Sequence, residues 1–342
     1  MIGARFIAFV VCVGIALSDR GLGEGANPSV FVADEGGGTL TVIDVVQGTS
    51  RQLPRPIVPH DVHLAADGGR LFAVGLARAI PQGGQAARGQ LLVFDIGCAP
   101  KLVGSVAVGT DPASVVTSED GQTAYVTDSE KGELVAVDLS RHAVRYRSEV
   151  GRGPHGLRLS PDHRVIAVAN AGDGSVSLVS IATGQESRRI QVGRRPLHVA
   201  FTPDGHRLLV SLNAENALAV VDVATGRVIA KVAVGTAPQQ VSVARDDKMT
   251  VVANRGWRGR PDNRVSLINL PAETVRHVRS GPGAHGIAID GRTAYVTNMH
   301  ADTLSLVDLD TGEVTQTFNT GRGPSGVAVR PLVNRGVNCP AD

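Results

Sequence analysis

The chain has 342 residues, 42% of them hydrophobic, which is enough to bury a large core. A formal net charge of +2 argues against a protein that binds nucleic acids or membranes through its overall charge. The 41 glycines and 18 prolines, with short apolar runs between turn signals and no sustained helical periodicity, predict an all-β protein. Because 3% of the residues are aromatic, the core must be built from Val, Leu, Ile and Ala.

The first residues are typical of a secretory signal peptide. Arg5 precedes an apolar run, residues 6–17, that is too short to span a bilayer, and a small-x-small pattern ends at Ser18. We expect cleavage after Ser18, so residues 1–18 form the signal and the mature chain has no transmembrane segment. This places the protein in the periplasm or outside the cell. A lipid anchor on Cys12 is the lesser alternative, because the small residues that such a site needs do not precede it.

Behind the signal, the sequence repeats with a period near 42 residues. The clearest marker is a proline just before the first strand of each unit, and four successive markers are 42 residues apart. Each unit holds four short apolar or β-branched runs separated by turn sequences, as in residues 281–321. This period is typical of the four-stranded blades of a β-propeller. The markers are Pro59, Pro112, Pro154, Pro196, Pro238, Ala284 in place of a proline, and Pro324.

Six complete units fit between the first and last markers, and the two ends of the chain supply a seventh. Residues 29–53 hold a second, third and fourth strand without a first, whereas residues 326–329 form a first strand with nothing after it. Pairing these ends closes the ring and removes exposed sheet edges. We therefore predict a seven-bladed β-propeller of four-stranded antiparallel blades over residues 27–333, followed by a tail at 334–342.

The second strands of several units share a pattern that points to a known family. Residues 124–128 read AYVTD and residues 294–298 read AYVTN, with shorter variants at 168–170 and 252–254. The pattern resembles that of the YVTN-repeat propellers, which include exported bacterial YncE-type proteins, and the similarity extends over nearly all of the mature chain. This resemblance implies the fold. It does not imply one function, because related propellers include binding and surface proteins, lactonases and the haem d1 domain of nitrite reductase.

The direction of the strands sorts the loops onto two faces of the ring. In each unit the first strand runs from the proline to a turn of the Asp-Gly kind, and the second strand returns. The loops before first strands and after second strands therefore share one face, which we call the mouth face. The Asp-Gly and Thr-Gly turns lie on the opposite face, which we call the turn face.

Histidines recur at one position of the repeat, directly after the proline or its substitute. They are His60, His155 and His285, and because first strands line the central channel they could converge at its mouth. Neutral imidazoles bind copper, zinc or iron, and haem takes an axial histidine. The alternative is a polar channel mouth that holds water or an undefined ligand. Since the three blades are not all adjacent, whether His155 reaches the other two stays open.

Other polar side chains fall beside these histidines in the repeat. Gln239 occupies the histidine position of its own blade, and Asp61 and His198 occupy the next position in theirs. We regard all three as candidate ligand-binding residues of the channel mouth.

Two insertions lengthen loops of the mouth face, at residues 76–90 and 255–264. The second carries four arginines and the single tryptophan of the chain. Arginine forks bind carboxylate or phosphate, and an indole offers a stacking or cation-π surface, so this rim is a candidate site for an anion. The alternative is a solvated rim. One tryptophan and three tyrosines are too few platforms to favour nucleic acid. The rim candidates are Arg255, Trp257, Arg258 and Arg260.

Two cysteines follow strands that end on the turn face of adjacent blades. Cys98 follows the third strand of blade 2, and Cys339 follows the C-terminal strand of blade 1. In an oxidising compartment this placement predicts a disulfide that fixes the tail. The alternative is two free or intermolecularly paired thiols.

The sequence favours an exported, monomeric and non-catalytic binding or scaffold protein. Its mouth-face funnel would receive an anionic small molecule or a protein partner. No Gly-rich phosphate loop, Ser-His-Asp order or Gly-x-Ser-x-Gly elbow stands out. The alternative is a periplasmic redox protein that uses the three channel-mouth histidines with copper, iron, haem or zinc.

Overall fold

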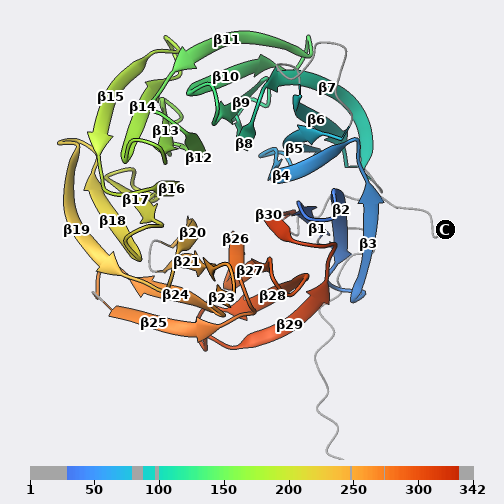
Figure 1. The fold of residues 1–342 in the computed structure, drawn as a ribbon, viewed down its shortest axis with the longest axis vertical. Coiled ribbons are helices and arrows are strands. Elements are labelled where there is room, and N and C mark those ends of the chain that lie inside the picture. The colour runs from blue at the N-terminus through green and yellow to red at the C-terminus, as the bar shows by residue number, and fades with distance from the viewer. Residues whose placement is uncertain (1–28, 79–87, 97–99, 247–248, 273, 331–342) are drawn as a thin grey trace, which may run out of the picture.

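The computed structural model describes residues 29–78, 88–96, 100–246, 249–272 and 274–330. Seven four-stranded antiparallel sheets surround a central channel, which confirms the predicted seven-bladed propeller (Figure 1). Within the described residues, no helix is long and apolar enough to cross a membrane. The predicted signal peptide, the C-terminal tail and both cysteines of the predicted disulfide lie outside the described residues.

The strands follow one another from the channel outwards in six of the blades. Blade 2 holds β4 (Ile57–Leu64), β5 (Arg70–Ala77), β6 (Gly89–Asp95) and β7 (Lys101–Gly109). Blade 3 holds β8 (Pro112–Thr117), β9 (Thr123–Asp128), β10 (Glu133–Asp138) and β11 (Ala143–Glu149). Blade 4 holds β12 (Pro154–Leu159), β13 (Val165–Asn170), β14 (Ser175–Ser180) and β15 (Glu186–Gln191).

The next three blades repeat this order, and blade 6 carries an extra hairpin. Blade 5 holds β16 (Pro196–Phe201), β17 (Arg207–Leu212), β18 (Ala217–Asp222) and β19 (Arg227–Ala233). Blade 6 holds β20 (Pro238–Val243), β21 (Thr250–Asn254), β24 (Arg264–Asn269) and β25 (Thr274–Arg279), with β22 (Gly256–Trp257) and β23 (Arg260–Pro261) between its second and third strands. Blade 7 holds β26 (Ala284–Asp290), β27 (Thr293–Asn298), β28 (Thr303–Asp308) and β29 (Val314–Asn319).

Blade 1 is built from both ends of the described chain, as the strand count predicts. It holds β1 (Ser29–Asp34), β2 (Thr39–Asp44), β3 (Thr49–Pro54) and, next to the channel, β30 (Pro324–Val329). Strand β30 pairs antiparallel with β1, with Phe31 opposite Ala328. The Gly321 N–H donates to both Asp34 Oδ1, at 3.1 Å, and Thr41 Oγ1, at 3.0 Å. The ring is therefore closed by hydrogen bonds between distant parts of the sequence.

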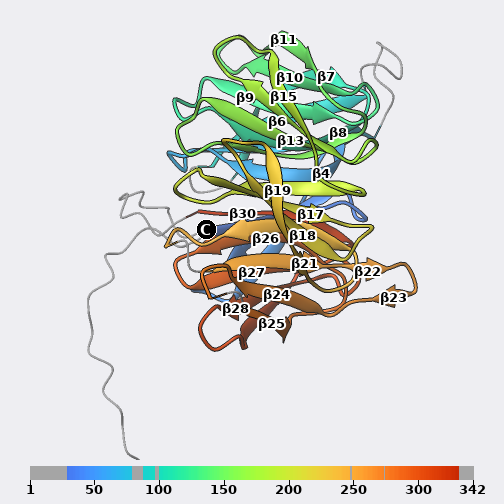
Figure 2. The same cartoon turned by 90° about the vertical axis from the view of Figure 1, so that its left-hand side faces the viewer.

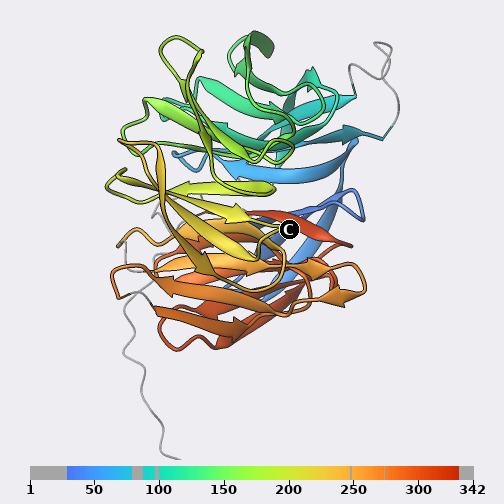
Figure 3. The ribbon, with the colours of Figure 1, turned by 60° about the vertical axis from the view of Figure 1, so that its left-hand side comes forward.

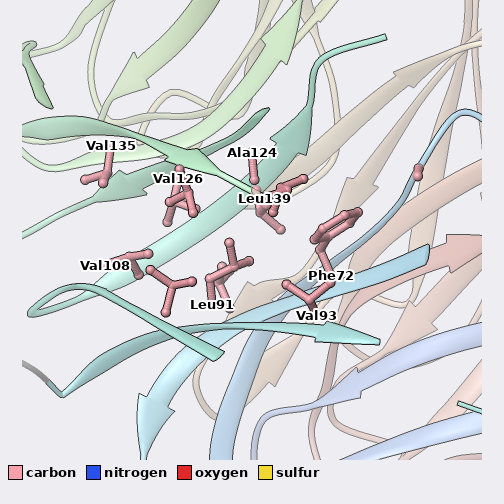
Figure 4. Packing of buried hydrophobic residues seen from close by; sticks show 13 residues of the cluster. Phe72, Leu91, Val93, Val108, Ala124, Val126, Val135 and Leu139 are labelled. Atoms are coloured by element: carbon pink, nitrogen blue, oxygen red, sulfur yellow. The ribbon is translucent and has the colours of Figure 1, made fainter. Parts of the chain in front are cut away.

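The core lies between neighbouring blades. Leu91 and Val108 of blade 2 pack with Val126 and Val135 of blade 3, and all four are buried (Figure 4). The inner three strands of each blade are largely buried, whereas the outermost strands alternate between exposed and covered residues, as in β19. Small aliphatic side chains fill these interfaces because each sheet must pack face to face on two neighbours.

An Asn or Asp ends many of the second strands and binds its own blade. Asn170 Nδ2 donates to the hydroxyls of Ser175 and Ser177, at 2.9 and 2.8 Å. In blade 1 Asp34 takes the same place and accepts from the hydroxyls of Thr39 and Thr41, each at 2.7 Å. These side chains satisfy buried polar groups of the blade, which is a structural role.

Candidate functional site

The three predicted histidines converge on the mouth-face end of the channel. The ring centroid of His60 lies 5.2 Å from that of His155 and 6.4 Å from that of His285. They come from β4, β12 and β26, which are the innermost strands of their blades (Figure 1). His155 therefore does reach His60, although two blade interfaces separate their strands, because first strands approach one another closely around the axis.

A β-bulge at the start of each of these strands places its histidine. The pairing of first with second strand shifts register between Pro59 and Asp61 in blade 2, and shifts likewise in blades 4 and 7. A bulge leaves residues out of the ladder and turns their side chains away from the regular pleat. The same local irregularity thus directs all three imidazoles to the channel mouth.

Each imidazole is oriented by a backbone carbonyl of the next blade. The Nδ1 atoms lie 2.6 Å from Ala113 O for His60, 3.2 Å from Leu197 O for His155, and 3.3 Å from Ser325 O for His285. A carbonyl can only accept, so the proton of each ring is on Nδ1. A neutral ring with this tautomer has a free lone pair on Nε2.

Burial keeps at least two of these rings neutral. It lowers the pKa of His155 to about 3, with a smaller contribution from His60, and it holds the pKa of His285 well below its usual value. Both imidazoles are therefore uncharged near pH 7. They contribute acceptor lone pairs to the channel mouth and no positive charge.

Above the histidines, on the mouth face, the channel widens into a funnel of about 940 Å³. Arg195, in the loop before β16, and Arg255, in the loop after β21, stand on its wall. Within the described part of the chain, neither guanidinium forms an ion pair or a hydrogen bond. Burial, and after it the charge of Arg195, lowers the pKa of Arg255, while Glu35 acts in the opposite direction. Among the described residues, the funnel thus presents two neighbouring cations without a direct partner, on a wall that also carries the carboxylates of Glu35 and Asp111.

The backbone of Arg195 is in an unusual conformation. Its φ is 54°, in the left-handed region, and it occupies the position just before the first-strand proline. Three other blades fill this position with glycine, at Gly153, Gly283 and Gly323, all of them with positive φ. A residue with a side chain pays roughly 1 kcal/mol or more in this conformation. Ala237 of blade 6 also has a positive φ, 50°, at this position, so the fold tolerates a side chain here, and in blade 5 that side chain carries a guanidinium to the funnel wall.

The predicted rim residues divide between two places. Arg255 lines the funnel, whereas Trp257, Arg258 and Arg260 lie on the β22–β23 hairpin, which projects from the mouth face of the propeller (Figures 2 and 3). These three side chains are exposed and do not line the funnel. The structure thus brings one of the four predicted rim residues to the channel, and adds Arg195.

The base of the hairpin is held by an ion pair. The Arg264 guanidinium makes two hydrogen bonds to Asp262, both of 2.9 Å, and Asp262 also accepts from the Thr236 N–H at 2.9 Å. Asp262 is buried. The arginine of this insertion that is closest to the blade therefore has a structural role.

Beneath the histidines lie the other predicted channel residues, Asp61, His198 and Gln239, all of them buried. Asp61 Oδ2 accepts from the Ser114 hydroxyl at 2.5 Å, and its Oδ1 accepts from the Val62 N–H at 3.0 Å. Burial raises the pKa of Asp61, and these hydrogen bonds and the charge of Arg158 oppose that rise. Asp61 is thus held by the fold, while His198 and Gln239 each keep a free donor.

The predicted metal-ligating histidines do not form a metal site as they stand in the described chain. Among the described residues, no group of three or more His, Cys, Asp or Glu side chains is arranged closely enough to hold a metal ion. The ring centroids of His60 and His285 are 6.4 Å apart, and this distance would have to shrink for both rings to bind one ion. The donor type suits copper, zinc or iron, but the spacing as it stands does not form a closed coordination sphere.

Comparison with known families supports the resemblance read from the repeats. Residues 157–258 match the family of YncE-like beta-propellers. Over 60 residues, 17% of the chain, the sequence is 43% identical to PE-PGRS family protein PE_PGRS18 of Mycobacterium tuberculosis. The chain spans 13% of the length of that relative.

Solved structures show the same fold over most of the chain. Hydrazine synthase of Kuenenia stuttgartiensis aligns with a TM-score of 0.70 and 21% identity, covering 82% of this chain and 91% of that one. A periplasmic gluconolactonase of Pseudomonas aeruginosa gives 0.68 and 18%, covering 89% and 99%. A putative 6-phosphogluconolactonase of Bacteroides fragilis gives 0.72 and 14%, covering 89% and 98%. At these identities the likeness concerns the fold.

Proposed function

We propose that this YncE-like propeller is a binding protein that holds an anionic small molecule in the mouth-face funnel, with Arg195 and Arg255 as its anchors. The observation that carries the proposal is a pair of guanidiniums, without a direct partner among the described residues, on the wall of a cavity of about 940 Å³. A cavity of this size is in the range of small-molecule sites. A bound carboxylate or phosphate would relieve the repulsion between the two cations and accept their hydrogen bonds.

The histidines on the floor of the funnel indicate which groups the ligand carries at its other end. His155 and His285 are neutral, so they add no second anion-binding charge there. Their Nε2 lone pairs accept hydrogen bonds, which favours hydroxyl or N–H groups on the part of the ligand that faces the channel. The ligand class is therefore a small organic acid with polar groups beyond its acidic end.

We further infer that the protein acts outside the cytoplasm. The supporting observations are the signal-type sequence of residues 1–18 and the fold shared with a periplasmic gluconolactonase. A ligand taken up there is a solute of the periplasm or of the cell exterior. Mass spectrometry of the mature protein, isolated after expression in a bacterial host, would show an N-terminus after Ser18; retention of residues 1–18 would contradict export.

The anchor is tested by removing both charges. We expect calorimetric titration with phosphate, citrate and a panel of simple carboxylates to identify a binding anion. The double substitution Arg195→Ala with Arg255→Ala should weaken its binding by at least about a hundredfold, because each charged hydrogen bond contributes roughly 1.5–3 kcal/mol.

The matched control removes the same charge from the hairpin. Arg258→Ala with Arg260→Ala should leave the affinity within about twofold, because these side chains lie away from the funnel. Equal weakening by both double substitutions would show that binding follows net charge and would overturn the funnel as the site. Failure of the wild-type protein to bind any anion of the panel would also contradict the proposal.

A second function has one specific observation in its favour. In metal sites the histidine commonly donates its second ring N–H to a carbonyl or carboxylate, and His60, His155 and His285 all donate Nδ1–H in this way. With their Nε2 atoms drawn together, the three rings would hold copper, zinc or iron, and a single ring would serve as an axial haem ligand.

Elemental analysis and a visible spectrum of protein from its own compartment separate the two functions. Stoichiometric metal or haem, lost when the three histidines are replaced by alanine, would establish the second. A colourless and metal-free protein with an intact fold would exclude it.

A further inference from the structure

A small chamber lies at the bottom of the funnel, inside the channel. Its volume is about 10 Å³, which is the space of one water molecule or one oxygen atom of a ligand. It is enclosed by residues of the first strands of six blades. The chamber is continuous with the funnel, because five residues line both: His60, His155, Leu197, Gln239 and His285.

Two buried N–H groups in this chamber have no hydrogen-bond partner within the described residues. They belong to His198 Nε2 and Gln239 Nε2, and both side chains are 3% exposed. The Val241 N–H donates to His198 Nδ1 at 3.4 Å, so the lone pair of this ring is on Nδ1 and its proton is on Nε2. Burial holds the pKa of His198 well below its usual value, which excludes a second proton near pH 7.

Two other polar side chains around the chamber, Asp61 and Gln240, already have partners within the fold. Both oxygens of Asp61 accept hydrogen bonds, from Ser114 and Val62. Gln240 Oε1 accepts from the Ile287 N–H at 2.9 Å. An orphaned buried donor carries its full desolvation cost, so an acceptor atom in the chamber would relieve two such costs at once.

We propose that this chamber is the terminal subsite of the funnel and takes one neutral acceptor oxygen of the ligand, a ketone, aldehyde or amide carbonyl, between the N–H groups of His198 and Gln239. In the free protein one water accepts both hydrogen bonds, and the carbonyl oxygen replaces it. A second carboxylate does not suit this end, because the chamber is lined by Asp61. The inference rests on the proposed anion site, and makes the ligand an acid with a carbonyl group at its far end.

Matched pairs of acids test this subsite in the full-length mature protein. We would titrate straight-chain keto acids of increasing length, beginning with levulinate, each against the alkanoate that lacks the ketone, beginning with valerate. For the keto acid whose length fits, two net hydrogen bonds should give a preference of about tenfold over its alkanoate.

Substitution of Gln239 then identifies the donor. Gln239→Met keeps the length of the side chain and removes its N–H groups, so we expect the preference for the ketone to fall by about three- to tenfold, with alkanoate affinity unchanged. Gln52→Met makes the same chemical change on β3, in the outermost strand of blade 1, and should leave the preference intact. The circular dichroism spectrum and melting temperature check that each variant is folded.

Each result is decisive. Equal affinity for keto acid and alkanoate at every length would overturn the subsite and leave the anion anchor standing. Binding of neither series would overturn the subsite, and it would overturn the anion anchor as well if phosphate and citrate also fail to bind. A preference that persists in Gln239→Met, or a structure of the wild-type complex in which water still fills the chamber and the ketone lies outside it, would also overturn the subsite.

Discussion

The two ends of the channel use arginine in opposite ways. In the funnel, Arg195 and Arg255 have no direct partner among the described residues. Deeper in the channel, toward the turn face, Arg158 lines a second cavity of about 200 Å³, where its Nη1 donates to Leu157 O at 2.9 Å and its charge acts on Asp61. An arginine that donates to the fold has a structural role, whereas one on a cavity wall with no hydrogen bond among the described residues is available to a ligand.

The histidines at the two ends of the channel are both neutral and differ in their partners. His63, in the deeper cavity, is buried enough to lower its pKa to about 3, and its Nε2 lies 3.2 Å from Thr117 Oγ1. His285, at the funnel, is also neutral, but its Nδ1 contacts a carbonyl and its Nε2 has no hydrogen bond among those found in the described chain. Each ring therefore makes one hydrogen bond within the described residues, to a side-chain hydroxyl at the inner end and to a backbone carbonyl at the funnel.

The largest expected effect is a loss of stability when Asp61, at the inner end of the channel, is replaced. Asp61→Ala removes the acceptor of the Ser114 hydroxyl and the Val62 N–H, together with the charge that faces Arg158. We expect a loss of about 3 kcal/mol in the free energy of unfolding, measured by urea denaturation, because two buried donors are left unsatisfied. Asp111→Ala, on the funnel wall, is the control and should cost less than about 0.5 kcal/mol. Similar losses of unfolding free energy in Asp61→Ala and Asp111→Ala would contradict the difference between the two ends of the channel.

A smaller effect concerns a carboxylate that lies close to the funnel but is used by its own blade. Burial raises the pKa of Asp34 from 3.8 to about 6, against the hydrogen bonds of Thr39, Thr41 and Gly321. Because the folded pKa is raised, the stabilising contribution of the protonated form is complete below about pH 4 and is lost as the pH rises through 6. The ionised form should cost about 2–3 kcal/mol at pH 8.

Asp34→Asn should abolish this loss, since asparagine takes the same place in other blades and donates to the hydroxyls of their third strands, as Asn170 does. Unfolding free energies at pH 4 and pH 8 measure this loss. The variant should be more stable than the wild type at pH 8 and not at pH 4. A wild-type stability that does not fall between these pH values would show that Asp34 ionises normally.

Arg195 offers a still smaller and more informative change. Arg195→Gly removes the guanidinium and suits a φ of 54°, so we expect a gain of up to about 1 kcal/mol in stability together with weaker anion binding. His163→Gly is the control, because His163 has a φ of 56° in a turn between the first and second strands of blade 4. This variant should stabilise the protein without changing anion binding. Weaker anion binding in both variants, or in neither, would show that Arg195 is not part of the anion site.

The smallest effect is expected on the hairpin. Trp257 is 42% exposed and lies outside the funnel. Trp257→Ala should change the unfolding free energy by less than about 0.5 kcal/mol and leave small-anion affinity within the error of a titration. A marked loss of anion affinity would mean that the hairpin folds over the funnel when ligand is bound.

Much of the fold, and part of the site, could be read from the repeat. Pro154 and Pro196 mark where blades begin, and the unpaired strands at the two ends of the chain require closure through β30. The histidine position of the repeat correctly placed three side chains at one height in the channel. Arg195 was missed, although its signal was present: an arginine precedes Pro196 where glycine precedes Pro154 and Pro324.

The sequence by itself determined the number of blades, the closure of the ring and the height of each residue along the channel, because a repeat of fixed period sets every strand in the same register. The tertiary structure alone decided which side chains meet around the axis. Arg195 and Arg255 come from different blades, and the lone pair on His198 depends on the Val241 N–H of the next blade. Contacts between blades depend on how the closed ring packs, and a pattern within one blade carries no record of that packing.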